Sequence, residues 1–380
     1  MLLGSHTKWR WLAAAVSMML FIPTLCAQES PVSAHRPLHY QNPIYDADFP
    51  DPTVIRSSDG YFYAYGTQTV SAGSWINIQV AWSADLKNWQ LIGDALPVKP
   101  IWANQRQNFW APHVTQVGST YYMYFSADPN SATGLCLAVA TASSPTGPFT
   151  DKGTPLKCGG GFVNIDPMEF DDPQTGKRFL YWGSGFQPIK VQELAADRIN
   201  FLPGSQPVDL IQPINSSDPN MYRDLVEGAW ITFRNGYYYL FFSGDDCCTS
   251  AHYAVMVARS ISATGPFEVL ADNNGVILKG NNSWLGPGHN SVIRDDGGED
   301  WLVYHAYHPD DRARGRVMLM DKLVYGVDGW PRTNADSPSR SRKLAPLINR
   351  STRVRPTARA GEPPSEIKKV RSRVAAVQQR

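Results

Sequence analysis

The sequence predicts an all-β protein folded as a five-bladed β-propeller. First, one pattern recurs five times at a spacing of roughly 55 to 62 residues, within the range of propeller repeats. Second, aromatic and β-branched runs in each copy are separated by turn residues such as SSDG, RNG and DDGG, as in β-hairpins. Third, no sustained helical periodicity follows the N-terminal leader, which disfavours a fold of alternating strands and helices.

Each repeat begins with one polar or small residue, runs through a short strand, turns, and enters an aromatic strand. The five copies read DPTVIRSSDGYFYAYG from Asp51, APHVTQVGSTYYMYFS from Ala111, DPMEFDDPQTGKRFLYWGS from Asp166, EGAWITFRNGYYYLFFSG from Glu227, and HNSVIRDDGGEDWLVYHAY from His289. After each copy comes a second pair of strand-like stretches, so we expect four strands in each blade. Because the first strand of every blade lines the central channel, the five starting residues should surround one end of it.

This arrangement gathers three carboxylates, those of Asp51, Asp166 and Glu227, and the imidazole of His289. An Asp before Pro is ordinarily a turn residue, so neither aspartate is informative alone. Glu227 differs, because it opens the apolar run VEGAW, where a charge without a role or partner would be costly. The convergence of all three predicts a catalytic site.

The three carboxylates suit cleavage of a glycosidic bond. That reaction needs one carboxylic acid to protonate the departing oxygen and one carboxylate to activate water or attack the sugar. Carboxylates held close together push their pKa values apart, so one stays protonated while the other stays ionised. A third carboxylate can orient the acid and help to raise its pKa.

The charge distribution argues against nucleic acid as a partner. Residues 40–335 carry 20 Lys and Arg against 30 Asp and Glu, a net charge of −10. Such an acidic body repels a phosphate backbone, whereas a neutral polysaccharide is indifferent to it. Aromatic residues make up 12% of the chain, which suits sugar stacking and a β-rich core alike.

The first 27 residues predict a cleaved signal peptide. Lys8 and Arg10 precede an apolar run over residues 11–25 that is too short to span a bilayer comfortably, and small residues follow at Cys26 and Ala27. A transmembrane anchor is the alternative. We therefore expect a secreted or periplasmic protein without stable membrane insertion, in which residues 28–39 link the leader to a propeller domain at 40–335.

Four cysteines remain after the leader, which is an even number in an export context where disulfides persist. They are Cys136, Cys158, Cys247 and Cys248. The adjacent pair can bridge each other or reach elsewhere, so the connectivity stays open.

Residues 336–380 predict a basic, disordered tail. They contain no Phe, Trp or Tyr and carry 12 Lys and Arg against 3 Asp and Glu. Such a segment cannot bury enough apolar area to offset the entropy of ordering.

Over about residues 40–335 the sequence resembles glycoside hydrolase family 43. The motifs that carry the resemblance are DADFPDPTVIR with Asp51, WAPHV with Trp110, the IDP that contains Asp166, YWGSGF with Trp182, VEGAW with Glu227, and GPGHNSV with His289. The resemblance implies inverting hydrolysis of α-L-arabinofuranosides or β-D-xylosides. It also implies that Asp51 is the general base, Glu227 the general acid, and Asp166 the residue that orients the acid and tunes its pKa.

The resemblance extends to substrate and ion binding. Arg316, in GRVMLM, matches an arginine that reaches the sugar and the base; the alternative is a surface arginine at a strand end. Trp110 and Trp182 are candidate stacking walls, unless they are buried. His289 matches a histidine near a water-coordinated cation, often calcium, although a histidine that plugs the channel is the alternative. The chemistry itself requires no cofactor.

GPGHNSV followed by YHAYHP resembles the arabinan-acting side of the family. We therefore expect an arabinofuranosidase or arabinanase that acts on arabinan or arabinoxylan chains. A β-D-xylosidase or a xylan-debranching arabinofuranosidase is the alternative within the family. A propeller that binds carbohydrate without cleaving it is disfavoured, because all three carboxylates are retained. Exo or endo action depends on the loops VSAGSW and GDDCCTSAH.

Overall fold

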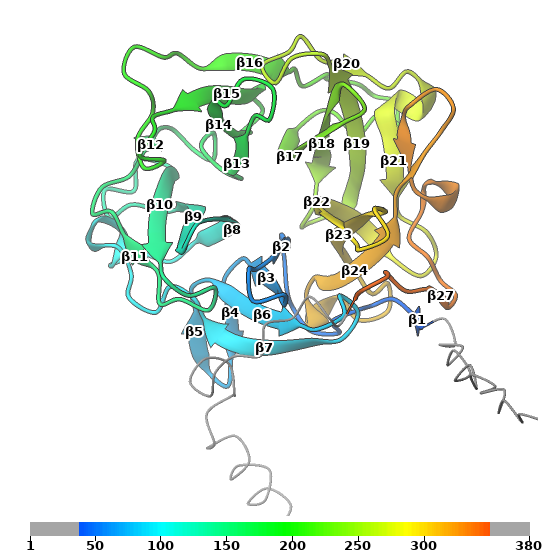
Figure 1. The fold of residues 1–380 in the computed structure, drawn as a ribbon, viewed down its shortest axis with the longest axis horizontal. Coiled ribbons are helices and arrows are strands. Elements are labelled where there is room, and N and C mark those ends of the chain that lie inside the picture. Colours follow the sequence, from blue (N-terminus) through cyan, green and yellow to red (C-terminus); the bar gives the residue numbers. More distant parts are fainter. Residues whose placement is uncertain (1–37, 350–380) are drawn as a thin grey trace, which may run out of the picture. The chain divides into compact units, whose positions relative to one another are not determined.

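The computed structural model describes residues 38–349, and these form a ring of five β-sheets around a central axis (Figure 1). The predicted five-bladed propeller is confirmed. The predicted leader and residues 350–380 of the predicted tail lie outside the described residues. Within the described range, the structure contains no helix with the length and hydropathy of a membrane span.

Four blades contain four or five antiparallel strands each. The first blade is formed by β2 (Thr53–Arg56), β3 (Phe62–Gly66), β6 (Gln79–Ser83) and β7 (Trp89–Asp94). The second is formed by β8 (Phe109–Val117), β9 (Thr120–Ala127), β10 (Cys136–Ala142), β11 (Thr150–Asp151) and β12 (Lys157–Cys158). The third is formed by β13 (Met168–Asp171), β14 (Arg178–Trp182), β15 (Ile189–Leu194) and β16 (Val208–Ile211). The fourth is formed by β17 (Val226–Arg234), β18 (Tyr237–Asp246), β19 (His252–Ser260), β20 (Glu268–Val269) and β21 (Val276–Lys279).

The fifth blade and the connections complete the described elements. The fifth blade is formed by β22 (Leu285–Arg294), β23 (Asp300–Tyr307) and β24 (Val317–Lys322). Three two-stranded pairs lie outside the blades: β1 (His39–Tyr40) with β27 (Lys343–Leu344), β4 (Thr69–Ser71) with β5 (Ser74–Ile76), and β25 (Val324–Tyr325) with β26 (Pro331–Arg332). Short 3₁₀ turns lie at Ile101–Ala103, Asp272–Gly275, Arg312–Arg314 and Asn334–Asp336.

The prediction of four strands per blade is wrong for the fifth blade, whose sheet has three. The chain leaves β24 into the β25–β26 hairpin and does not return to the sheet. The free edge of β24 is paired by the N-terminal segment instead: Ile44 N–H donates to the carbonyl oxygen of Met318 (2.9 Å), and Met318 N–H donates to that of Tyr45 (3.1 Å). The two ends of the propeller domain thus close the ring together.

The predicted tail is folded over its described part. β27 pairs with β1, and Leu347 N–H donates to a carboxylate oxygen of Asp295 (3.0 Å). Ala345 and Ile348 pack against the apolar core between the first and fifth blades. The prediction of a disordered tail is therefore wrong for residues 336–349. Their aliphatic side chains cover apolar surface of the propeller, which the basic composition of the segment did not indicate.

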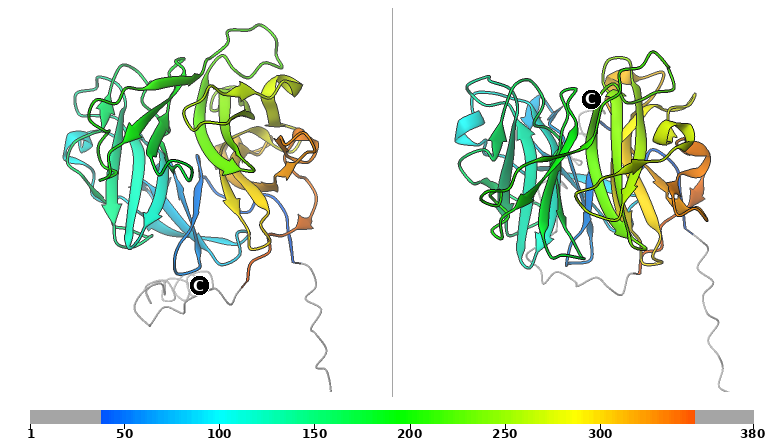
Figure 2. Two further views of the ribbon diagram at one scale, coloured as in Figure 1. Left: turned by 45° about the horizontal axis from the view of Figure 1, so that its top comes forward. Right: turned by 90° about the horizontal axis from the view of Figure 1, so that it is seen from above.

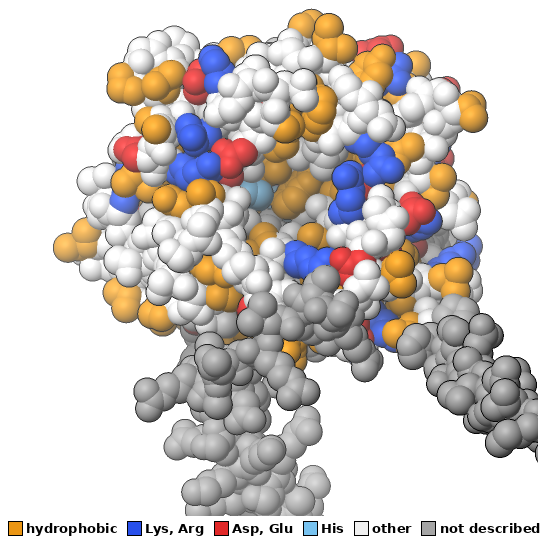
Figure 3. Space-filling model, viewed as in Figure 1, with side chains coloured by type: hydrophobic (Ala, Val, Ile, Leu, Met, Phe, Trp, Pro, Cys, Tyr) orange, Lys and Arg blue, Asp and Glu red, His pale blue; other side chains and the backbone are white. Residues whose placement is uncertain are grey.

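The apolar core lies between neighbouring blades, which stand side by side around the axis (Figure 2). β3 and β23 are buried at every position, because a strand inside a blade has both faces covered by adjacent blades. This explains the aromatic second strand of each repeat. Viewed down the axis in Figure 3, the centre of the ring is hollowed, with a histidine at its base and charged side chains around it.

One backbone conformation repeats at the start of every innermost strand. The residue there has a left-handed φ between 46° and 60°, and its N–H donates to a side chain of the preceding blade, except at the first blade, where the acceptor is in the fifth. The five contacts are Asp51 to His305 Nδ1 (3.1 Å), Ala111 to Thr67 Oγ1 (2.8 Å), Asp166 to Ser126 Oγ (3.1 Å), Gly228 to Asp166 Oδ2 (3.0 Å) and His289 to Ser243 Oγ (2.8 Å). These bonds fix where each strand begins, and therefore where its first side chain points.

Candidate active site

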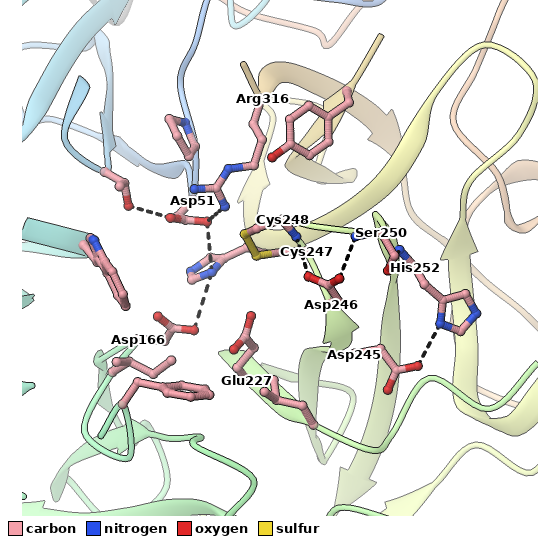
Figure 4. Close-up of a pocket in the computed structure, with 18 of the residues that line it drawn as sticks. Asp51, Asp166, Glu227, Asp245, Asp246, Cys247, Cys248, Ser250, His252 and Arg316 are labelled. Carbon is pink, nitrogen blue, oxygen red and sulfur yellow. Dashed lines mark hydrogen bonds and ion pairs between the residues drawn. A yellow bond between two sulfur atoms is a disulfide. The ribbon is translucent and has the colours of Figure 1, made fainter. Parts of the chain in front are cut away.

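A cavity of about 890 Å³ opens at the end of the channel where the innermost strands begin. Asp51, Asp166 and Glu227 all line it, and Figure 4 shows their carboxylates directed toward a common space. The predicted convergence of the three acids is therefore what the structure shows. The placement of Glu227 differs in one respect: the left-handed residue of the fourth blade is Gly228, so Glu227 lies one position earlier than the other two acids.

Asp51 is held as a carboxylate by positive and hydrogen-bonding neighbours. Arg316 donates to Oδ1 at 2.8 Å, and the Thr67 hydroxyl donates to Oδ2 at 2.5 Å. Burial raises the pKa of this carboxyl, but Arg316, His289 and His305 outweigh burial and hold the pKa well below its usual range. Asp51 is therefore ionised and able to accept a proton across the ordinary pH range.

Glu227 is in the opposite state. Its side chain is buried, and one polar contact is the Tyr253 hydroxyl, which donates to Oε1 at 2.8 Å. Burial raises the pKa of Glu227 to about 7 with help from the charge of Asp51, against the opposing effects of Tyr253 and Arg316. A carboxyl with this pKa is largely protonated in weakly acidic solution and can donate a proton.

Asp166 interacts with Glu227 through charge and through a hydrogen bond to the backbone of the residue that follows Glu227. Its Oδ2 accepts the N–H of Gly228, the residue after Glu227, at 3.0 Å. Burial, followed by the charges of Glu227 and Asp51, raises the pKa of Asp166 well above its usual range. The charge of Glu227 thus disfavours ionisation of Asp166, and the bond to Gly228 ties Asp166 to the strand that carries the acid. The role of Asp166 in tuning and orienting Glu227 stays a prediction.

We expect Tyr253→Phe to move the basic limb of the pH–rate profile to higher pH. The hydroxyl stabilises ionised Glu227, and a hydrogen bond to a charged group is worth about 1.5–3 kcal/mol, or about one pH unit or more. Without it the acid stays protonated to higher pH. The measurement is kcat/KM against pH. Tyr304→Phe is the matched control, because Tyr304 donates to Asp321 (2.6 Å) and does not line the cavity. An unmoved or lowered limb in Tyr253→Phe would contradict this assignment.

Two of the predicted sugar-binding residues line the cavity and one does not. Trp110, on β8, lines it, and Arg316 lines it in contact with Asp51, so the surface-arginine alternative is wrong. Trp182 was predicted as a stacking wall, and this prediction is wrong. Its side chain is fully buried at the end of β14, where it packs in the core between the second and third blades, 5.8 Å from the ring of Phe201. At this end of β14 both faces of the strand are covered by core packing.

His289 lies between the two aspartates. Its Nδ1 is 3.4 Å from Asp51 Oδ1 and 3.6 Å from Asp166 Oδ2, and burial lowers its pKa. Across residues 38–349, no group of three or more His, Cys, Asp or Glu side chains is arranged to hold a metal ion. A cation beside His289 would need water for most of its ligands, as the expectation assumed, and calcium stays a prediction.

Three residues that contact the acids or the base were missed in the sequence: Thr67, Tyr253 and His305. A signal for two of them existed. The position that follows the aromatic run of the second strand is polar in all five repeats. Its residues are Thr67, Ser126, Ser184, Ser243 and His305. Four hydroxyls and one imidazole at equivalent positions indicate a shared bonding role. Tyr253 had no such signal, because an aromatic residue in a strand is ordinarily part of the core.

The structure pairs the four described cysteines in two disulfides. Cys136 is bonded to Cys158, which joins β10 to β12, and Cys247 is bonded to its neighbour Cys248. The second pair lies in the predicted GDDCCTSAH loop, which lines the cavity. The VSAGSW loop forms most of the β4–β5 hairpin and does not line it.

Comparisons with known proteins agree with this geometry. Residues 40–331 match the model of "Glycosyl hydrolases family 43". The extracellular endo-α-(1→5)-L-arabinanase 1 of Bacillus subtilis is 28% identical over 74% of this chain and 86% of its own length. The β-D-galactofuranosidase xynD of Aspergillus niger is 31% identical over 76% and 83%, respectively. A thermostable family-43 glycoside hydrolase of known crystal structure superposes with a TM-score of 0.69 at 28% identity, covering 82% of this chain and 100% of that one.

Proposed function

This chain belongs to glycosyl hydrolase family 43, and from that premise we propose that it hydrolyses α-L-arabinofuranosyl linkages of arabinan-type polysaccharides with inversion of configuration. The observation that carries the proposal is the pairing, in one cavity, of a carboxyl held ionised with a carboxyl held protonated. Asp51 and Glu227 are those two groups. An enzyme that cleaves a glycosidic bond by direct displacement needs both at once.

In the proposed reaction, the Asp51 carboxylate takes a proton from a water molecule as that water attacks the anomeric carbon. Glu227 donates its proton to the departing glycosidic oxygen, so a neutral alcohol leaves. Arg316 keeps Asp51 ionised and stands at the cavity surface, where its remaining N–H groups can bind sugar hydroxyls. Burial and the charge of Asp51 keep the proton on Glu227, and Asp166 orients the acid by accepting the N–H of Gly228, the residue that follows it.

The substrate follows from the relatives. The Bacillus and Aspergillus proteins are named for arabinan and for a galactofuranoside, and both names denote five-membered sugar rings. The bacterial relative and the YHAYHP motif favour arabinose. We further propose that the protein is exported, since its N-terminal sequence has the order of a signal peptide and the Bacillus relative is named as extracellular.

Product analysis tests the function directly. The purified protein is incubated with linear arabinan, branched arabinan and xylan, and with aryl α-L-arabinofuranoside, β-D-xyloside and β-D-galactofuranoside. We expect release of arabinose or arabino-oligosaccharides, and NMR of the first-formed sugar should show the inverted anomer. Release of xylose alone would favour the β-D-xylosidase alternative over arabinan hydrolysis. A retained anomer would contradict the role of Asp51 in activating water.

A further inference from the structure

The bonded pair Cys247–Cys248 lies on the wall of the catalytic cavity. It occupies the turn that joins β18 to β19 in the fourth blade, and both residues line the cavity. Figure 4 shows the two sulfur atoms between Arg316 and Asp246. The reaction as proposed gives this disulfide no task.

The turn is held in place by bonds that do not involve sulfur. The carboxylate of Asp246 accepts the N–H groups of Cys248 (2.9 Å), Thr249 (2.9 Å) and Ser250 (2.6 Å). The Arg312 guanidinium donates to the carbonyl oxygens of Cys248 (3.1 Å) and Thr249 (3.0 Å). Because the backbone N–H and carbonyl oxygen of Cys248 already have partners, its sulfur is the group that it can still offer a ligand.

A bonded sulfur pair is a soft, polarisable and weakly polar surface. It carries no thiol proton, so it neither donates a hydrogen bond nor titrates. The covalent bond also fixes the surface before a ligand arrives, which lowers the ordering cost of binding. Such a surface suits the C–H face of a sugar ring and offers little to a hydroxyl.

The remainder of the cavity is also suited to a sugar ring. Trp110 lines it from the second blade, which in a ring of five lies across the axis from the fourth and fifth. Phe162, in the segment before β13, and Phe186, in the turn between β14 and β15, also line it, with their ring centroids 5.9 Å apart. Nonpolar walls around a few placed polar groups are the usual composition of a ligand site.

The turn also lies near the reacting groups. Glu227 is paired with Ser243 across β17 and β18, and Asp246 follows three residues later, about 10 Å along the strand. The charge of Asp246 acts on Glu227. A sugar ring bound next to Glu227 therefore has the disulfide within reach.

We propose that the Cys247–Cys248 disulfide is a substrate-binding surface that packs against the nonpolar face of a furanosyl ring held beside Glu227. This inference rests on the proposed function and adds a binding element to the same site. It makes the disulfide a determinant of substrate affinity, with no part in proton transfer.

The test compares two double variants on the substrate that the unmodified enzyme cleaves best. Cys247→Ser with Cys248→Ser should lower kcat/KM about ten-fold, mainly through KM, with little change in the thermal midpoint, because Asp246 and Arg312 still hold the turn. Cys136→Ser with Cys158→Ser is the matched control. It removes the disulfide outside the cavity, so it should lower the thermal midpoint and leave KM unchanged.

Two further readouts separate direct contact from other effects. The pH–rate profile of Cys247→Ser with Cys248→Ser should match that of the unmodified enzyme; a displaced basic limb would mean that the loss acts through Asp246 and Glu227, and would overturn the proposal. Calorimetric binding of arabino-oligosaccharides is then measured in a Glu227→Gln background. Weaker binding without the disulfide supports the inference, and equal binding overturns it. If the protein with both disulfides neither binds nor cleaves any furanoside, the proposed function itself fails, and this inference with it.

Discussion

Glu227→Gln is expected to lower kcat on arabinan by about 10²- to 10⁴-fold, the usual contribution of a general acid. Glutamine keeps the size of the side chain and can still contact the Tyr253 hydroxyl, so the cavity should be preserved. What is lost is the proton that burial keeps on Glu227 near neutral pH. The loss should be much smaller on an aryl arabinofuranoside with a good leaving group, because such a group departs without protonation.

The ratio of the two losses is the diagnostic measurement. Steady-state kinetics are recorded on arabinan and on the activated aryl substrate, with Glu193→Gln as the control. Glu193 is a carboxylate outside the cavity that pairs with Lys177 at 2.9 Å, so its replacement should change neither rate. Equal losses of Glu227→Gln on both substrates would mean that Glu227 is not the proton donor.

Asp51→Asn is expected to lower kcat by a similar factor, about 10²- to 10⁴-fold, but on both substrates alike. Water must be activated whatever the leaving group is, and an amide cannot accept the proton. The amide has one oxygen, so it can accept from Arg316 or from the Thr67 hydroxyl but not from both in the present geometry. Circular dichroism and the thermal midpoint are therefore measured beside the kinetics. A loss of kcat confined to arabinan in a folded variant would contradict the role of Asp51 as the base.

The pH dependence of the unmodified enzyme gives an independent check on Asp51. Since Arg316, His289 and His305 hold the pKa of Asp51 well below its usual range, protonation of this group should not reduce kcat/KM as the pH falls toward the ordinary aspartate range. The fall in activity should occur on the other side, as the pH rises through about 7 and Glu227 loses its proton. An acidic limb near the ordinary aspartate pKa that Asp51→Asn abolishes would contradict so low a pKa for this carboxyl.

The parts of the site that follow from the sequence repeat could be predicted. Asp51, Asp166 and His289 occupy the same position of three blades, so the symmetry of the fold brings them together whatever their surroundings. Glu227 could be placed to within one residue, because Gly228 takes the left-handed conformation in its blade. These placements need only the strand order and the spacing of the copies.

Features that depend on packing could not be predicted in the same way. Trp182 and Tyr253 are both aromatic residues in strands, yet one is enclosed by two blades and the other contacts Glu227. No sequence pattern separates them, because the difference lies in which blade covers each side chain. The prediction of a fourth strand in the fifth blade was wrong for a related reason. The edge of β24 is paired by the segment around Ile44 and Tyr45, which has no repeat pattern of its own.

The closure of the ring has a consequence for folding kinetics. The side chain of Asn42 donates to the carbonyl oxygen of Met320 across 278 residues of chain, and the bond from Arg316 to Asp51 spans 265. Contacts so remote in sequence form late, because the entropy of closing the loop must be overcome before they contribute. The general base gains its positive partner only in that step, so catalytic competence should appear after most of the sheet structure has formed.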